Sequence, residues 1–63
     1  MSMTLKAARI NAGLTQKEAA KAIGVTEDCI SNYERAKTFP NVQIIKKIEK
    51  AYHIGYADIN FLI

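Results

Sequence analysis

Near the middle of the chain, a group of polar side chains has the spacing of one helical face. Its members stand at i, i+1, i+4 and i+5: Glu27, Asp28, Ser31 and Asn32. Residues at this spacing lie side by side when the stretch is helical. The carboxylates accept hydrogen bonds, whereas the hydroxyl and the carboxamide both donate and accept. Such a set is suited to reading a hydrogen-bonding edge on another molecule.

The other reactive residue types do not form a catalytic or metal-binding set. The chain has one histidine and one cysteine, His53 and Cys29, and they lack the spacing of metal ligands. We therefore expect no enzyme activity, no metal and no cofactor. A lone cysteine cannot form an internal disulfide, which fits a reducing compartment. We interpret Cys29 as an ordinary small residue rather than a redox switch.

Composition and length indicate one small globular domain, residues 1–63. The chain has 63 residues, of which 49% are hydrophobic and 24% charged, with a net charge of +3. This composition is far from that of disordered chains, and a mildly basic charge is compatible with a nucleic-acid partner. No apolar run approaches the ~20 residues of a membrane span, and the first residues lack a signal-peptide core. We expect no membrane association and a cytoplasmic location.

Two short helices joined by a tight turn are predicted over residues 14–37. Thr15 is a helix N-cap with Glu18 three residues later, which is the capping-box pattern. Gly24 stands where a helix C-terminus favours a left-handed residue, and Thr26 caps the next helix. A helix, a glycine turn of about three residues and a second helix form the helix-turn-helix arrangement, whose second helix enters a DNA major groove.

The inward side of the second helix is predicted from its apolar residues. Ile30 and Tyr33 turn toward the core, which leaves the four polar side chains on the outer face. The helix-turn-helix would therefore present these side chains to base edges.

Further helices are predicted on both sides of this unit. The first covers residues 4–12, with Leu5, Ala8 and Ala12 on one face and Gly13 at its end. A loop through Pro40 follows the recognition helix, because the residue before a proline is disfavoured in helical geometry.

The C-terminal third is predicted to hold two helices. Asn41 caps the longer one, residues 42–52, whose inward residues are predicted to be Val42, Ile45, Ile48 and Tyr52. A last short helix is predicted at 56–62 with Ile59 and Leu62 inward. No period-two alternation is present, so the prediction is an all-α fold of five short helices without a sheet.

Several short motifs occur in an order that resembles a known family. They are Leu-Thr-Gln-x-Glu-Ala-Ala at 14–20, Ile-Gly-Val-Thr at 23–26, Ile-Ser-x-Tyr-Glu-Arg at 30–35 and Lys-Thr-x-Pro at 37–40. Together they resemble the phage repressor and Cro (Xre-type) DNA-binding family over residues 4–62. The resemblance implies a lambda-repressor-like domain with its helix-turn-helix at helices two and three. It also implies binding to double-stranded DNA and a role in transcription regulation.

Base contacts are implied for the four outward residues of the recognition helix. Asn32 has the chemistry to hold adenine N6 and N7, and Ser31 lies beside it. A carboxylate of Glu27 or Asp28 can accept from cytosine N4. The same carboxylates also offset the helix dipole while being repelled by DNA, so base reading and dipole capping both stay open.

Phosphate contacts are implied around this helix by the same resemblance. The candidates are Gln16, Lys17, Thr26, Arg35, Lys37, Thr38 and Asn41. Three further lysines, Lys46, Lys47 and Lys50, are interpreted as solvated charges on the polar face of their helix.

The resemblance also implies a structural ion pair and two departures from the family pattern. Arg9 and Glu34 match the arginine and glutamate that pair in the family. Ala36 and His53 stand where glycine is usual, so a left-handed backbone at these positions would be strained.

The assembly and the partners stay open between alternatives. An apolar C-terminal end, Phe61, Leu62 and Ile63, suggests a homodimer through the last helix on a two-fold symmetric operator. The alternatives are an antitoxin of this fold that binds a toxin partner and its own promoter, or a domain that has lost DNA binding.

Overall fold

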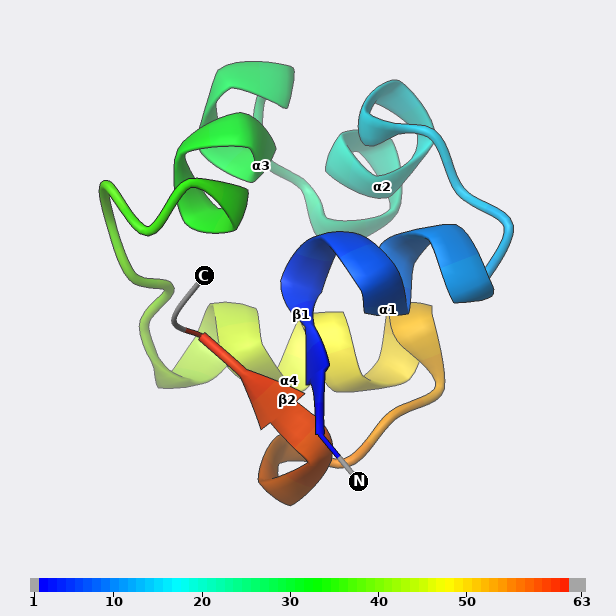
Figure 1. Ribbon diagram of the computed structural model, residues 1–63. Coiled ribbons are helices and arrows are strands. Elements are labelled where there is room, and N and C mark those ends of the chain that lie inside the picture. The colour runs from blue at the N-terminus through cyan, green and yellow to red at the C-terminus, as the bar shows by residue number, and fades with distance from the viewer. Residues whose placement is uncertain (1, 62–63) are drawn as a thin grey trace.

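The computed structural model describes residues 2–61 and is mostly helical (Figure 1). Its elements are β1 Met3–Thr4, α1 Leu5–Asn11, α2 Gln16–Ile23, α3 Glu27–Glu34, α4 Val42–Tyr52, the 3-10 helix η1 Tyr56–Asp58 and β2 Ile59–Asn60. Figure 1 shows α2 and α3 together on one side of the molecule, with α1 and α4 below them. Within residues 2–61, no helix has the length and apolar character needed to cross a membrane.

Each α-helix begins at a polar N-cap whose side chain accepts from a first-turn amide. The four caps are Thr4, Thr15, Thr26 and Asn41, and the last three were predicted. The capping box at α2 is complete, because the Glu18 amide donates to Thr15 Oγ1 (3.1 Å) and the Thr15 amide donates to Glu18 Oε1 (2.9 Å). The bonds from Thr15 lower the pKa of the Glu18 carboxyl. These local bonds set where the helices begin.

A left-handed residue follows each of the four α-helices, at its C-terminal end or one or two residues beyond it, and the first is Gly13 after α1 with φ 77°. Gly24 ends α2 with φ 87°, as predicted. Ala36, just after α3, and His53, at the end of α4, have φ of 59° and 53°. The two positions where the chain departs from glycine therefore keep the left-handed backbone, which is costly for a residue with a Cβ atom.

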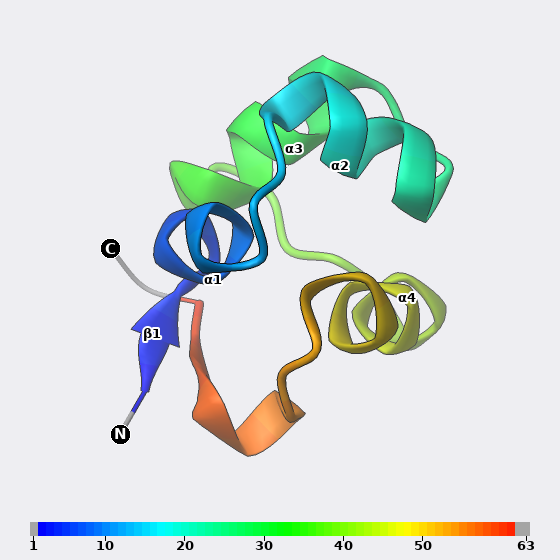
Figure 2. The ribbon, with the colours of Figure 1, turned by 90° about the vertical axis from the view of Figure 1, so that its right-hand side faces the viewer.

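The core lies where the four helices meet (Figure 2). Its buried apolar residues are Leu5, Ala8, Ala19, Ala20, Ile23, Ile30, Ile48, Tyr52 and Ile59. Helix α2 packs against both α3 and α4, and α1 contacts α3 and α4 from the other side. The small buried alanines Ala19 and Ala20 let α3 and α4 approach α2 closely, so that α2 holds the recognition helix in place.

The predicted fifth helix and the absence of a sheet are both wrong. Within the described part of this segment, residues 56–61, only Tyr56–Asp58 is helical, as a 3-10 turn. Ile59–Asn60 then runs parallel to Met3–Thr4, with Ile59 opposite Met3. Ile59 is buried as predicted, but from a strand. A helix this short is unstable by itself, and the strand also pairs its backbone with the start of the chain. Leu62 lies outside the described residues.

The predicted inward stripe of α4 is rotated relative to the observed one. Ile48 and Tyr52 are buried as predicted, and Ile44 packs beside them. Val42 is 68% exposed instead of inward. Apolar residues cover more than one face of this helix, so periodicity alone does not determine which face is turned to the core.

Candidate DNA-binding interface

The outer face of α3 carries the four residues expected to read bases. Glu27 and Asp28 are exposed, and Ser31 and Asn32 are half-buried. On the opposite face Ile30 is 2% exposed and packs into the core. The apolar side of the helix is therefore fixed, and its polar side forms one surface.

The carboxylate of Glu34, at the end of α3, accepts hydrogen bonds from side chains of α1 and α2. Arg9 of α1 donates from Nε to Glu34 Oε2 (2.6 Å) and from Nη2 to Oε1 (3.3 Å). Gln16 of α2 donates from Nε2 to Glu34 Oε1 (3.1 Å). Arg9 Nη1 also donates to the carbonyl oxygen of Leu14 (2.9 Å). The predicted contact between Arg9 and Glu34 is thus present, whereas the bond from Gln16 was not anticipated from the sequence.

Burial makes this network sensitive to the loss of a member. The side chains of Arg9 and Glu34 are 9% and 6% exposed, and within residues 2–61 no buried side-chain polar atom lacks a hydrogen-bond partner. The charges of Arg9 and Glu34 also act on the phenol of Tyr52, which belongs to α4. Burial and the charge of Glu34 raise the pKa of Tyr52 to about 12, although the Arg9 charge opposes the shift.

The phosphate candidates lie in the first turn of α2, at the two ends of α3 and in the loop before α4, and their side chains keep hydrogen-bond donors available. Thr26 and Asn41 use their side-chain oxygens as helix caps, which leaves the hydroxyl hydrogen and the amide NH₂ available. Gln16 gives one of its two amide hydrogens to Glu34. The remaining candidates are exposed: Lys17, Arg35, Lys37 and Thr38.

The end of the recognition helix carries a bond between two of the candidate residues. Arg35 donates from Nη2 to Asn32 Oδ1 (3.1 Å). A base-contact candidate and a phosphate candidate are therefore joined. Their i, i+3 spacing is the signal in the sequence that permits the contact.

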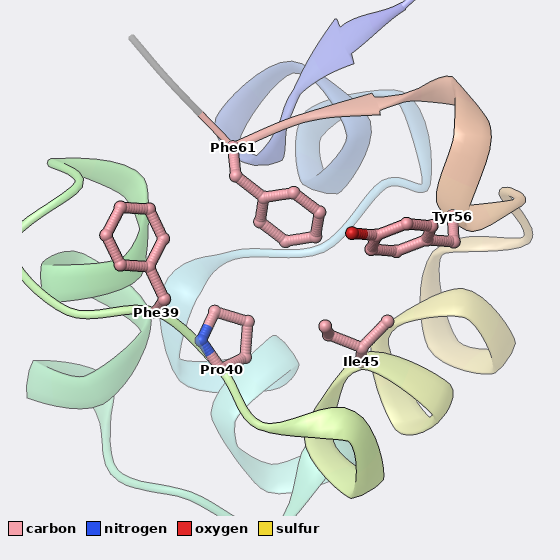
Figure 3. A pocket seen from close by; sticks show the side chains of 5 residues that line it. All are labelled: Phe39, Pro40, Ile45, Tyr56 and Phe61. Atoms are coloured by element: carbon pink, nitrogen blue, oxygen red, sulfur yellow. The ribbon is translucent and has the colours of Figure 1, made fainter.

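An apolar groove, not expected from the sequence, lies beside the loop between α3 and α4 (Figure 3). It has a volume of about 250 Å³ and is lined by Phe39, Pro40, Ile45, Tyr56 and Phe61. The rings of Tyr56 and Phe61 pack with centroids 5.6 Å apart. We call this surface the C-terminal groove.

A second hollow continues the C-terminal groove along α4. It shares Ile45 and Tyr56 and adds Val42, Lys46 and Glu49. Phe39 and Tyr56 are 61% and 56% exposed. An exposed apolar cluster of this kind on so small a domain is typical of a contact surface.

The comparison with protein families decides the class of this fold. A family model described as helix-turn-helix matches residues 5–59, which is most of the chain. The chain belongs to the helix-turn-helix family. In this helix-turn-helix protein, α2 and α3 are the paired helices, and Gly24 makes the turn between them.

Two curated relatives match parts of this helix-turn-helix chain. The "HTH-type transcriptional regulator ImmR" of Bacillus subtilis (strain 168) is 40% identical over 51 residues, which is 81% of this chain and 40% of that protein. The "Endothelial differentiation-related factor 1 homolog" of Danio rerio is 46% identical over 43 residues, which is 68% of this chain and 30% of that protein. The chain thus spans less than half the length of either relative. No solved structure matches significantly.

Proposed function

We propose that the protein binds double-stranded DNA sequence-specifically and regulates transcription. The observation that carries the proposal is the outer face of α3, where four polar side chains lie on a helix anchored by Ile30 and by the bonds of Glu34. The Bacillus relative is named as a transcriptional regulator, which supports the same function. A rigid helix with one polar face is what direct reading of a major groove requires.

Backbone contacts in this proposal come from the start of α2 and from the two ends of α3. The free amide hydrogen of Gln16 and the first amides of α2 converge on one phosphate. Thr26 donates at the start of α3, while Lys37, Thr38 and Asn41 contact phosphates beyond its end. Lys17 and Arg35 add positive charge.

The acidic first turn of α3 has two competing explanations: its carboxylates read bases, or they only offset the helix dipole. Within residues 2–61, neither Glu27 nor Asp28 forms an ion pair, so both charges face solvent. If Asp28 reads cytosine, Asp28→Ala relaxes preference at one operator position. If Asp28 serves only the helix dipole, Asp28→Ala tightens binding to all sequences alike, because a charge repelled by phosphate has been removed.

The experiment is selection of bound sites from random duplexes, followed by measurement of affinity against salt concentration. We expect an enriched operator and a linear fall of log K with log salt. Lys37→Ala should weaken all sequences alike and lower the slope by about one. Lys50→Ala, an exposed charge on α4, is the matched control and should leave the slope unchanged. No enriched sequence, or equal effects of the two changes, would contradict the proposal.

The proposed form on DNA is a homodimer that meets through the C-terminal groove. The groove begins at Phe39, in the same loop as the phosphate candidates Lys37 and Thr38. Two copies bound to half-sites about 34 Å apart would therefore bring these apolar faces toward each other. The self-complementary contact of a two-fold dimer covers such a patch on both copies.

A further inference from the structure

The bond between Arg35 and Asn32 restricts how the recognition helix presents Asn32. Arg35 Nη2 lies 3.1 Å from Asn32 Oδ1. Asn32 is half-buried on the outer face of α3, and Arg35 is exposed at the end of the helix. Both residues are candidates for contact with DNA. A bond between them therefore changes which hydrogen-bond donors and acceptors each can offer to it.

The chemistry of the pair fixes the orientation of the carboxamide. A guanidinium group has donors and no acceptor, so the atom of Asn32 that faces it must be the oxygen. The NH₂ group then points away from Arg35. No residue within 2–61 accepts a hydrogen bond from Asn32 Nδ2. Arg35 therefore uses one of the two lone pairs of Oδ1, whereas both hydrogens of Nδ2 are free to donate.

We propose that Arg35 is a positioning residue that makes Asn32 select guanine rather than adenine. This inference rests on the proposed DNA-binding function. Guanine presents two acceptors in the major groove, O6 and N7, whereas adenine presents the N7 acceptor and the N6 donor. An unattached asparagine pairs with both adenine groups. With its oxygen held by Arg35, Asn32 turns its NH₂ group to the base. This gives guanine O6 and N7 two donors, and it faces the N6 donor of adenine with a donor instead of an acceptor.

The test compares base preference in the wild type, Asn32→Ala and Arg35→Ala by competition between labelled duplexes. Asn32→Ala identifies the operator position whose preference depends on Asn32. At that position we expect the wild type to favour guanine over adenine by about fivefold or more. In Arg35→Ala the carboxamide is released, and we expect the guanine-to-adenine ratio to fall by at least about fivefold. A ratio is unaffected by a general loss of affinity.

Lys37→Ala is the control for the charge of Arg35, because it removes a neighbouring cation and keeps the backbone bond from the Lys37 amide to the Asn32 carbonyl oxygen. It should weaken guanine and adenine operators equally. A wild-type preference for adenine or a pyrimidine at the Asn32 position, or an unchanged ratio in Arg35→Ala, overturns the inference while leaving the proposed function standing. If the wild type enriches no sequence at all, the proposed function fails and this inference with it.

Discussion

At the scale of single residues, the ion pair of Arg9 and Glu34 is the most costly interaction to disturb. Both charged side chains are nearly buried, and Arg9 Nε lies 2.6 Å from Glu34 Oε2. Ion pairs of this kind contribute little net stability against an apolar alternative, because both charges lose their hydration. Removing one partner is different, since the other charge is then left buried without its match.

We therefore expect Arg9→Ala and Glu34→Ala each to lower the free energy of unfolding by about 3 kcal/mol. The double variant should cost less than the sum of the two, because it leaves no unmatched charge. Urea unfolding of all four proteins gives the coupling energy. Lys6→Ala, on the exposed side of α1, is the control and should stay within ~0.5 kcal/mol of the wild type. Additive small losses would show that the two charges are not coupled.

Ala36 gives a second prediction at this scale. Its φ of 59° places a Cβ atom in the left-handed region, which costs about 1 kcal/mol relative to glycine. Ala36→Gly should remove this strain and raise the melting temperature by a few degrees, on the scale of ~4–8 °C per kcal/mol for a domain of this size. Circular dichroism melting measures the shift.

Ala22 is the matched control for the alanine-to-glycine change. It is exposed within α2, where φ is helical, so Ala22→Gly should destabilise the protein by about 1 kcal/mol. A lower melting temperature for Ala36→Gly would show that chain entropy outweighs strain at this turn.

At the scale of elements, α4 contributes Tyr52 to the core, where the Glu34 carboxylate acts on it. This residue is 4% exposed, and burial together with the Glu34 carboxylate raises the pKa of its phenol from 10.0 to about 12. A raised pKa in the folded state means that the neutral phenol stabilises the fold below pH 10. That contribution is lost as the pH rises from 10 to about 12, because the unfolded chain releases the proton first.

Tyr52→Phe should therefore lose less stability than the wild type between pH 10 and pH 12. Urea midpoints measured across this window at constant ionic strength give the comparison. Tyr56→Phe is the control, since Tyr56 is 56% exposed and should follow the wild-type curve. Parallel curves for the wild type and Tyr52→Phe would contradict the assignment of the alkaline loss to Tyr52.

At the scale of the whole molecule, the C-terminal groove is the surface through which we propose that two copies meet. Phe39→Asp places a charge in the proposed dimer contact, so we expect binding to a two-fold operator to weaken by roughly tenfold. Binding to an isolated half-site should hardly change. Because Phe39 is 61% exposed, the fold should tolerate the change.

Ile10→Asp is a matched control for this charge. Ile10 is equally exposed, at 58%, but lies on α1 and does not line the groove. It should leave operator binding and sedimentation unchanged. A wild type that sediments as a monomer at high concentration and protects a single half-site would rule out the dimer.

The sequence by itself was sufficient for what is local or periodic. The caps at Thr15, Thr26 and Asn41 and the left-handed Gly24 follow from bonds within a few residues, so residue type at each position predicts them. The inward side of α3 follows from Ile30 and Tyr33 for the same reason. The resemblance to the family also predicted the contact between Arg9 and Glu34, although these residues lie 25 positions apart in the sequence.

Only the tertiary structure decided the features that depend on distant partners. A strand of two residues shows no alternation, so the pairing of Ile59 with Met3 is set by the backbone groups that packing brings together. The side of α4 that faces the core is chosen among several apolar residues by α2, which is why Val42 is exposed. The bond from Gln16 to Glu34 likewise exists because two helices meet there, and neither residue alone indicates it.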